Sequence, residues 1–280
     1  LARTFGAQLQ LVGCVYDPYV AGERFADSPD LKAAREALVE QRRAELDALA
    51  AEHGGDGLTP SVQAIWAYPV YEGLVTACQD FAADLMVSGT FHHSALQRFG
   101  LTNTDWQLIR HAPCPLLLVR NDGFSGYHKV LAAVDPMHTH DKPAGLDDRL
   151  LDAAELFAGT AAGEVHVLHC YLTGEYVPLT APGAAVPALF YNRESPAEAH
   201  REAVEALARR HGLAPDRIHI KAGDARQLIP DVAAELGIQL VVMGAVSRSR
   251  LKRLLIGSTA EAVLDGLRCD VLILKPESGT

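Results

Sequence analysis

Two patterns of hydrophobic positions alternate along the chain. Short, almost continuous apolar runs, such as Leu240–Met243 and Val271–Leu274, are typical of strands buried on both faces. Longer segments between them carry apolar residues at helical spacing, as in residues 30–53. Strands that alternate with helices predict right-handed crossovers and a parallel sheet covered by helices on both faces.

The pattern predicts a complete series of elements in the second half and a similar series in the first. In the second half we expect strands at 129–135, 164–171, 216–222, 238–244 and 270–275, and helices at 147–159, 195–211, 224–236 and 258–268. In the first half we expect strands at 8–16, 61–67, 84–89 and 115–120, and helices at 30–53, 70–83 and 103–111. Residues 121–128 read as a linker, which predicts domains at 1–122 and 129–280.

An internal repeat relates the two halves. Residues 89–121 align with residues 244–276 at a constant offset of 155 without a gap, and Gly89 falls on Gly244. Cys14 matches Cys170 at an offset of 156. The second repeat opens earlier, at Lys129, so the matching strand of the first repeat would lie about 28 residues before Leu1. We therefore expect the first strand and most of the first helix of the first domain to be absent from the sequence.

Composition narrows the class of protein. A chain of 280 residues gives about 140 residues to each unit, enough for its own core. The net charge of −10 argues against a general nucleic-acid binder. No apolar run approaches the roughly 20 residues that span a bilayer. Five cysteines without CxxC spacing fit a reducing cytoplasm, and Cys78 is either a helix core residue or a reactive thiol.

The loop after Gly244 carries the clearest candidate chemistry. Four cations follow it, and then Gly257-Ser258-Thr259 opens the last helix, with Glu261 in its first turn as in a capping box. The unpaired N–H groups at a helix N-terminus bind phosphate. The cations are Arg248, Arg250, Lys252 and Arg253. The loop is therefore a phosphate site or, alternatively, a solvated basic patch.

The same positions resemble a known family. Gly244, two residues, Ser247, nine residues and Gly257-Ser258 resemble the nucleotide-phosphate motif of universal stress proteins, with Ser247 in place of a glycine. Together with residues 102–106, 257–261 and 267–270, the motif is most similar to the tandem, E-like members of that family.

The resemblance implies a fold and a site. It implies two Rossmann-like domains, each a five-stranded parallel sheet with helices on both faces, packed as a pseudo-dimer through the last strands, 116–120 and 271–275. It also implies that ATP or another adenine nucleotide is a candidate ligand of the second domain. The candidate contacts are Asp135, Gly244, Ser247, Arg248, Gly257, Ser258 and Thr259. In the first domain His92 and Thr102-Asn103 replace motif residues, which disfavours a nucleotide there.

Other signals are weak. The histidines at 92, 93, 111, 138 and 140 lack metal-ligand spacing, so we expect solvated side chains and no metal. No catalytic motif is visible. We therefore expect a non-enzymatic stress-response protein that binds a small ligand or a partner protein and could form a homodimer. The alternatives are a carrier of an apolar or lipid-like ligand under the Pro-rich segment 173–192, an ATP-hydrolysing switch, and an interaction scaffold.

Overall fold

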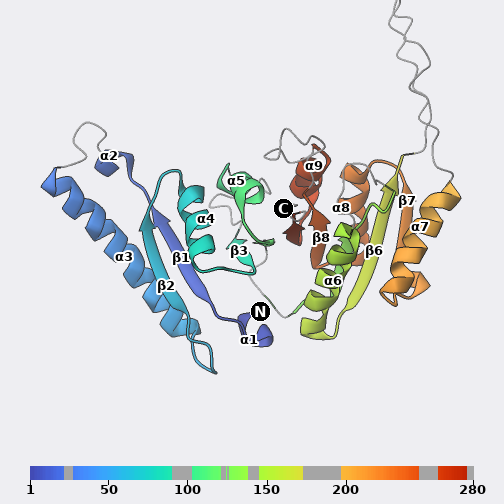
Figure 1. The fold of residues 1–280 in the computed structure, drawn as a ribbon, viewed down its shortest axis with the longest axis horizontal. Helices are drawn as coiled ribbons and strands as arrows, with labels where there is room; N and C mark the ends of the chain where they lie inside the picture. The colour runs from blue at the N-terminus through green and yellow to red at the C-terminus, as the bar shows by residue number, and fades with distance from the viewer. Residues whose placement is uncertain are drawn as a thin grey trace, which may run out of the picture. The chain divides into compact units, whose positions relative to one another are not determined.

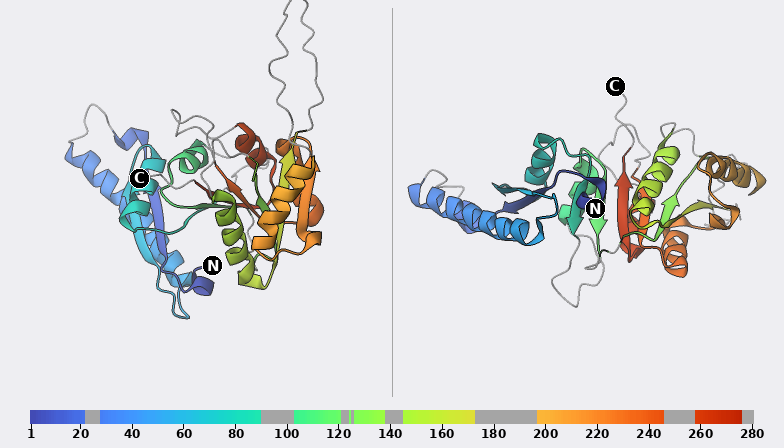
Figure 2. Two further views of the ribbon diagram at one scale, coloured as in Figure 1. Left: turned by 45° about the vertical axis from the view of Figure 1, so that its right-hand side comes forward. Right: turned by 90° about the horizontal axis from the view of Figure 1, so that it is seen from below.

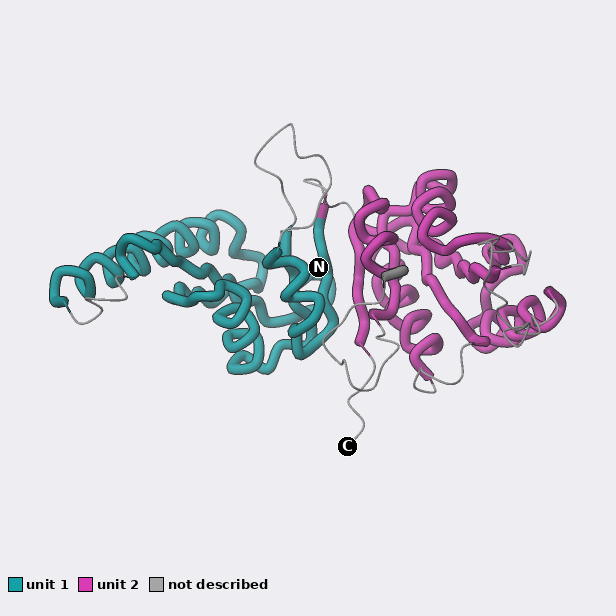
Figure 3. The backbone as a smooth tube through the Cα atoms, turned by 90° about the horizontal axis from the view of Figure 1, so that it is seen from above, with its two compact units in different colours: residues 1–96, 100–119 teal, residues 97–99, 120–280 magenta. Residues whose placement is uncertain are grey.

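The computed structural model divides the chain into two compact units (Figure 3). Unit 1 holds residues 1–96 and 100–119, and unit 2 holds residues 97–99 and 120–280. The structure describes residues 1–21, 28–89, 103–120, 124, 126–137, 145–172, 197–245 and 258–275, except the side chains of 258 and 259.

Unit 2 is built on a five-stranded parallel sheet (Figure 1). Its strands run in the order β9-β8-β5-β6-β7, and every neighbouring pair is parallel. The strands are β5 (Lys129–Ala133), β6 (Glu164–Tyr171), β7 (Ile218–Ala222), β8 (Leu240–Gly244) and β9 (Asp270–Leu274). The sequence prediction of five strands in this repeat is confirmed, and the apolar runs that form β8 and β9 lie in the core.

Helices cover both faces of this sheet. The chain runs from β5 to β7 in one direction and then returns to β8 and β9, so right-handed crossovers place two helices on each face. Contacts between α8 and α9 place those two helices on one face, opposite α6 and α7 (Figure 2). The helices are α6 (Leu146–Ala158), α7 (Ala197–Arg210), α8 (Ala225–Leu236) and α9 (Ser258–Gly266), with short 3-10 turns η1 (Gly159–Ala161) and η3 (Pro215–Arg217).

Unit 1 contains two separate strand pairs. Among the residues that the structure describes, β1 pairs with β2 alone and β3 pairs with β4, in parallel register. The elements are α1 (Ala2–Phe5), β1 (Gln10–Val15), α2 (Pro18–Ala21), α3 (Pro29–His53), β2 (Ser61–Trp66), α4 (Val70–Asp80), β3 (Met86–Gly89), α5 (Asn103–His111) and β4 (Leu116–Val119). The predicted helices and strands of this repeat are confirmed within a few residues at each end.

A central strand accounts for the difference between the units. In unit 2, β5 bonds to both β6 and β8, the repeat counterparts of β1 and β3. The described part of unit 1 has no strand that joins β1 to β3. Val87 of β3 is 54% exposed, whereas its counterpart Val242 is 0% exposed. The core of unit 1 is therefore less covered than that of unit 2.

The end of the linker belongs to the core of unit 2. Tyr127 is 2% exposed, and its hydroxyl donates a 2.8 Å hydrogen bond to Oδ2 of Asp270. The backbone N of Arg120 donates to Oδ1 of the same carboxylate at 2.8 Å. Burial, and then the Asp270 charge, raise the pKa of Tyr127, so the hydroxyl keeps its proton and remains a donor. The sequence indicated only a polar linker here.

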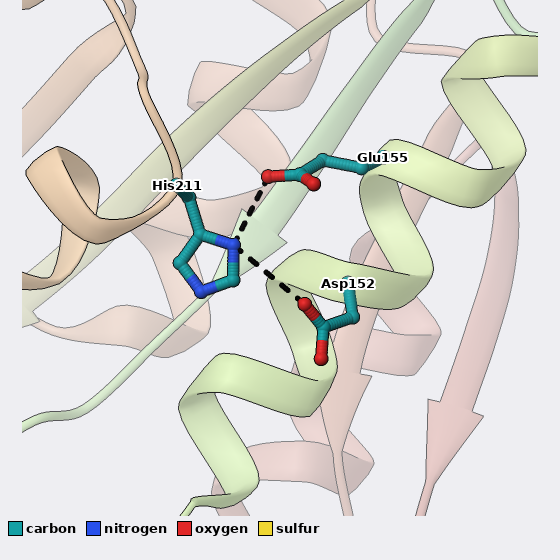
Figure 4. Close-up of side chains that lie close together, drawn as sticks. All are labelled: Asp152, Glu155 and His211. Atoms are coloured by element: carbon teal, nitrogen blue, oxygen red, sulfur yellow. Dashed lines mark hydrogen bonds and ion pairs between the residues drawn. The ribbon is translucent and has the colours of Figure 1, made fainter.

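A histidine braces α6 against the end of α7 (Figure 4). Asp148, Asp152 and Glu155 share one face of α6, and His211 follows α7. Nε2 of His211 lies 3.2 Å from Oδ1 of Asp148, and Nδ1 lies 3.0 Å from Oε1 of Glu155. Arg210 also donates to both oxygens of Asp148, at 2.8 and 3.0 Å. Partial burial would raise the pKa of Asp148, but the hydrogen bonds from Arg210 and His211 hold it below its usual range.

The packing of the two units through their last strands, β4 and β9, stays a prediction.

Replacing Tyr127 by Phe should destabilise unit 2. The change removes a buried donor and leaves one oxygen of Asp270 without it, which costs about 1–3 kcal/mol. Urea unfolding followed by circular dichroism measures this, because both tryptophans lie in unit 1 and their fluorescence does not report on unit 2. Tyr19→Phe is the control, since Tyr19 is 91% exposed. Equal effects of the two changes would contradict the assignment.

Replacing Asp148 by Asn should lower the thermal midpoint at pH 7 and have less effect in acid. A carboxyl whose folded pKa is lowered stabilises the fold above its unfolded pKa, about 3.9, and this contribution is lost as pH falls through the folded pKa. The loss at pH 7 should be at most about 1 kcal/mol, because solvent screens the pair. Asp152→Asn is the control, since its side chain is 69% exposed and 3.7 Å from His211. An Asp148→Asn effect that persists unchanged from pH 7 to pH 3 would exclude the ion pair as its cause.

Candidate functional site

The candidate site lies at the carboxyl edge of the unit 2 sheet. The chain reverses its direction of winding between β5 and β8, and ligands of open parallel sheets bind where the strand order reverses. Ala133 of β5 pairs with Met243 of β8, so Asp135 lies just after the end of β5 and Gly244 is the last residue of the adjacent strand β8. The structure thus brings together two residues that are more than a hundred positions apart in the sequence.

Hydrogen bonds hold both polar groups of the peptide bond between Val134 and Asp135. Its N–H donates to Oδ1 of Asp147 in the first turn of α6 at 3.0 Å. The preceding carbonyl, of Val134, lies 3.1 Å from Nδ1 of His169. The Asp135 side chain is 42% exposed, with Oδ1 at 3.8 Å from the same ring nitrogen. The backbone at Asp135 is therefore held in place, and its side chain is partly exposed at the carboxyl edge.

A stack of three rings stands behind Asp135. His169 is 1% exposed, and its Nε2 lies 2.8 Å from Nδ1 of His200 on α7. Tyr171 stacks on His200 with ring centroids 4.6 Å apart. A carbonyl only accepts, so Nδ1 of His169 donates to Val134 and, in the neutral ring, Nε2 accepts from His200. His169 therefore supports the backbone beside Asp135, and His200 and Tyr171 contact the His169 ring.

Sequence reasoning missed this stack because His169 and His200 belong to different elements and have no motif spacing. One signal was present in the repeat. The counterpart of His169 is Gly13, where a Cβ would come within 2.8 Å of Nε of Arg42 and 3.0 Å of Leu46. The two repeats therefore depart from internal symmetry at this strand position.

The loop between β8 and α9, the candidate phosphate site, is described only at its two ends. Ala245 donates from its backbone N to the Leu274 carbonyl at 3.0 Å, which places the chain after Gly244 beside the end of β9. Helix α9 begins at Ser258, the predicted start, and Glu261 lies in its first turn. The remaining loop candidates lie outside the described residues, namely Ser247, Arg248, Arg250, Lys252, Arg253 and Gly257, as do the side chains of Ser258 and Thr259.

Two described cations stand at the same edge. Arg149 lies in the first turns of α6, and its Nη1 donates to the backbone carbonyl of Lys275 at 3.3 Å. Lys275 directly follows β9. The acids Asp135, Asp147 and Asp148 offset this positive charge on the β5 side. The described part of the edge is therefore acidic beside β5 and basic beside β9, and the sequence showed only the cations of the loop.

A second histidine pair lies at the other end of β6. Nδ1 of His166 is 3.1 Å from Nε2 of His219 on β7, and their rings stack. Burial is the main cause that lowers the pKa of each ring. Both rings are therefore largely neutral at pH 7, and they join two strands away from the carboxyl edge.

Of the remaining candidates in the sequence, one differs from its prediction and several others lie outside the described residues. His111 was expected to be solvated, but it is only partly exposed and its ring stacks on Tyr71 at 5.2 Å. That expectation was wrong because the contact comes from α4, far away in sequence. Outside the described residues lie the histidines 92, 93, 138 and 140, Asp141, Thr102 and the segment 173–192.

The described residues include one group with metal-ligand geometry. Atoms of Asp152, Glu155 and His211 all lie within 4.8 Å of one another. In this arrangement both ring nitrogens of His211 face carboxylate oxygens, so the group forms the brace between α6 and α7. The expectation of no metal stays a prediction. Among the described helices, none combines the length and apolar character needed to cross a membrane.

The chain is similar to known proteins along most of its length. The sequence profile of the Universal stress protein family matches residues 1–120 and 126–275. Universal stress protein E of Escherichia coli strain K12 is 28% identical over 256 residues, which cover 89% of this chain and 79% of that protein. The Photorhabdus laumondii protein of the same name is 25% identical over 249 residues, covering 87% and 77%.

Solved structures agree with the sequence comparisons. A protein of unknown function from Pseudomonas aeruginosa PAO1 superposes with a TM-score of 0.71 at 29% identity, covering 99% of this chain and 85% of that one. A universal stress protein from Archaeoglobus fulgidus, 16% identical, shares the fold with a TM-score of 0.58, covering 97% and 88%. With a profile match to each repeat and the parallel α/β architecture of unit 2, the chain belongs to the universal stress protein family.

Proposed function

We propose that this chain is a non-enzymatic stress-response protein whose second unit binds an adenine nucleotide such as ATP. The observation that carries the proposal is the placement of Asp135 and Gly244 at the carboxyl ends of the adjacent strands β5 and β8, where the strand order reverses. Helix α9 starts after the same edge, so its first N–H groups are available to an anion.

Each residue of the site has a chemical role in this proposal. The Asp135 carboxylate accepts hydrogen bonds from a ribose hydroxyl or a base amino group. Gly244 lets the loop turn away from β8 without a Cβ beside the ligand. Residues 257–259 supply backbone N–H groups and hydroxyls to the phosphates, and Ser247 with Arg248 completes the loop. Arg149 and Lys275 add positive charge at the edge.

The proposal that the chain is not an enzyme rests on the residues described at the carboxyl edge of the unit 2 sheet. His169, the one described histidine beside Asp135, has both ring nitrogens engaged, with Val134 and His200. It therefore holds the backbone and is not placed to take a proton from a water molecule. The alternative function, an ATP-hydrolysing switch, would use the same loop. A measurement of phosphate release distinguishes it from binding without hydrolysis.

The two units should differ in binding. Unit 2 keeps Gly257-Ser258 and has Asp135 on a fixed backbone. Unit 1 has Thr102-Asn103 at the corresponding place, and its described strands include no counterpart of β5 to carry an aspartate. We infer one nucleotide per chain, bound at unit 2.

Replacing Gly257 by Val should abolish ATP binding. A branched side chain at the entry to α9 blocks close approach of the phosphates to its N–H groups. Isothermal titration with ATP and ADP should show one site per wild-type chain and none in the variant. A phosphate-release assay should detect no hydrolysis by either protein. Thr102→Val in unit 1 is the matched control and should bind like wild type. Binding that survives Gly257→Val but is lost in Thr102→Val would move the site to unit 1.

Nucleotide binding should be weak and salt-sensitive. Ser247 places a Cβ where the family motif has glycine, and exposed cations are screened over about 10 Å at 0.1 M salt. Ser247→Gly should tighten binding by roughly threefold to tenfold, on the order of 1 kcal/mol. Titrations at low and high salt test both statements. Nanomolar affinity that does not change with salt, or weaker binding by Ser247→Gly, would refute this account of the loop.

A further inference from the structure

Two cysteines of unit 1 touch each other. Cys78 lies near the end of α4 and is 7% exposed, and Cys114 lies half-buried just before β4. Their sulfur atoms are 3.5 Å apart, a direct contact. Within the described residues this is the one pair of cysteines whose sulfurs meet, and 35 residues of chain separate them.

The internal repeat shows that the pair belongs to unit 1 alone. The offset of 155 places Cys114 on Cys269 and Cys78 on Ala233. The backbone confirms the second match, because Ala83 donates to the Cys78 carbonyl at 3.0 Å and Ile238 donates to the Ala233 carbonyl at 2.8 Å. Unit 2 therefore keeps one thiol at this junction of helix and strand, whereas unit 1 has two.

We propose that Cys78 and Cys114 form a reversible disulfide in unit 1, with a small disulfide such as oxidised glutathione as the oxidant. The sulfurs must approach from 3.5 Å to about 2.05 Å, the length of a disulfide bond. The bond closes a ring that contains β3 and α5. The disulfide would therefore restrict the unfolded chain of unit 1, the unit whose core is less covered.

The reaction is a pair of thiol–disulfide exchanges. The Cys114 thiolate attacks one sulfur of the small disulfide, breaks its S–S bond and releases one molecule of the small thiol. The Cys78 thiolate then attacks the Cys114 sulfur of the mixed disulfide and releases the second. The two protons of the cysteines end on the two small thiols, and an excess of dithiol reverses both steps. Cys114 reacts first because it is the more exposed of the two.

The exchange is slow at neutral pH. Burial, and then the contact with Cys78, raise the pKa of Cys114 to about 12. A raised pKa means less thiolate at a given pH, and the thiolate is the attacking species. The rate should therefore rise about tenfold per pH unit between pH 7 and pH 9. Such slow formation of the disulfide suits a response to sustained oxidation and does not suit rapid sensing of peroxide.

Peptide mapping of the full-length protein tests the proposal. After incubation with oxidised glutathione and alkylation, wild type should lose the mass of two hydrogens and yield one linked peptide, Cys78 to Cys114, while Cys14, Cys170 and Cys269 remain alkylated. Dithiothreitol should restore the free thiols. Absence of the link from pH 7 to pH 9, or a link to another cysteine, would overturn the proposal.

Two variants separate the bond from general oxidation. Cys78→Ala copies the residue that unit 2 carries at Ala233, so it should fold and should stop at the glutathione adduct of Cys114. Tryptophan fluorescence reports on unit 1, since Trp66 and Trp106 both lie there. Oxidation should raise the urea midpoint of wild type and should not raise those of Cys78→Ala and Cys114→Ser. An equal rise in Cys78→Ala would show that the disulfide is not its cause.

Discussion

The central strand β5 determines most of the structure of unit 2. Its backbone is bonded on one side to β6 and on the other to β8, so it joins the two halves of the sheet. Because the chain winds in opposite directions from this strand, its carboxyl end is the point where ligands of such sheets bind. The same position buries the middle of the strand: Val130, Leu131 and Ala132 are each 0% exposed. Core and candidate site thus depend on one set of strand pairings.

The comparison with unit 1 shows what that strand contributes. There the two strand pairs remain separate, and apolar residues such as Val87 stay exposed. An aspartate corresponding to Asp135 has no described strand to carry it. We infer that the two repeats have diverged in chemistry, with a ligand site proposed in unit 2 and a thiol pair in unit 1. Duplication permits this, because each unit can keep its fold while its loops and junctions change.

Sequence reasoning predicted the elements well and the tertiary contacts poorly. Buried parallel strands are continuous apolar runs, so β8 and β9 were visible without a structure. The alignment of the repeats fixed Gly244 and the start of α9. Contacts such as those of His169 with His200, Tyr127 with Asp270 and Cys78 with Cys114 join residues far apart in sequence. No periodicity or spacing encodes such contacts, and only departures from internal symmetry, at Gly13 and Ala233, pointed to two of them.

Hydrogen exchange of the full-length protein with and without saturating ATP tests the central claim most directly. The claim is that one ligand site exists, at the carboxyl edge of the unit 2 sheet. It predicts slower exchange in peptides that cover residues 131–137, 240–245 and 258–266, and no change at 86–89 and 103–111. Protection at the unit 1 peptides, or unchanged exchange at the unit 2 edge, would contradict it.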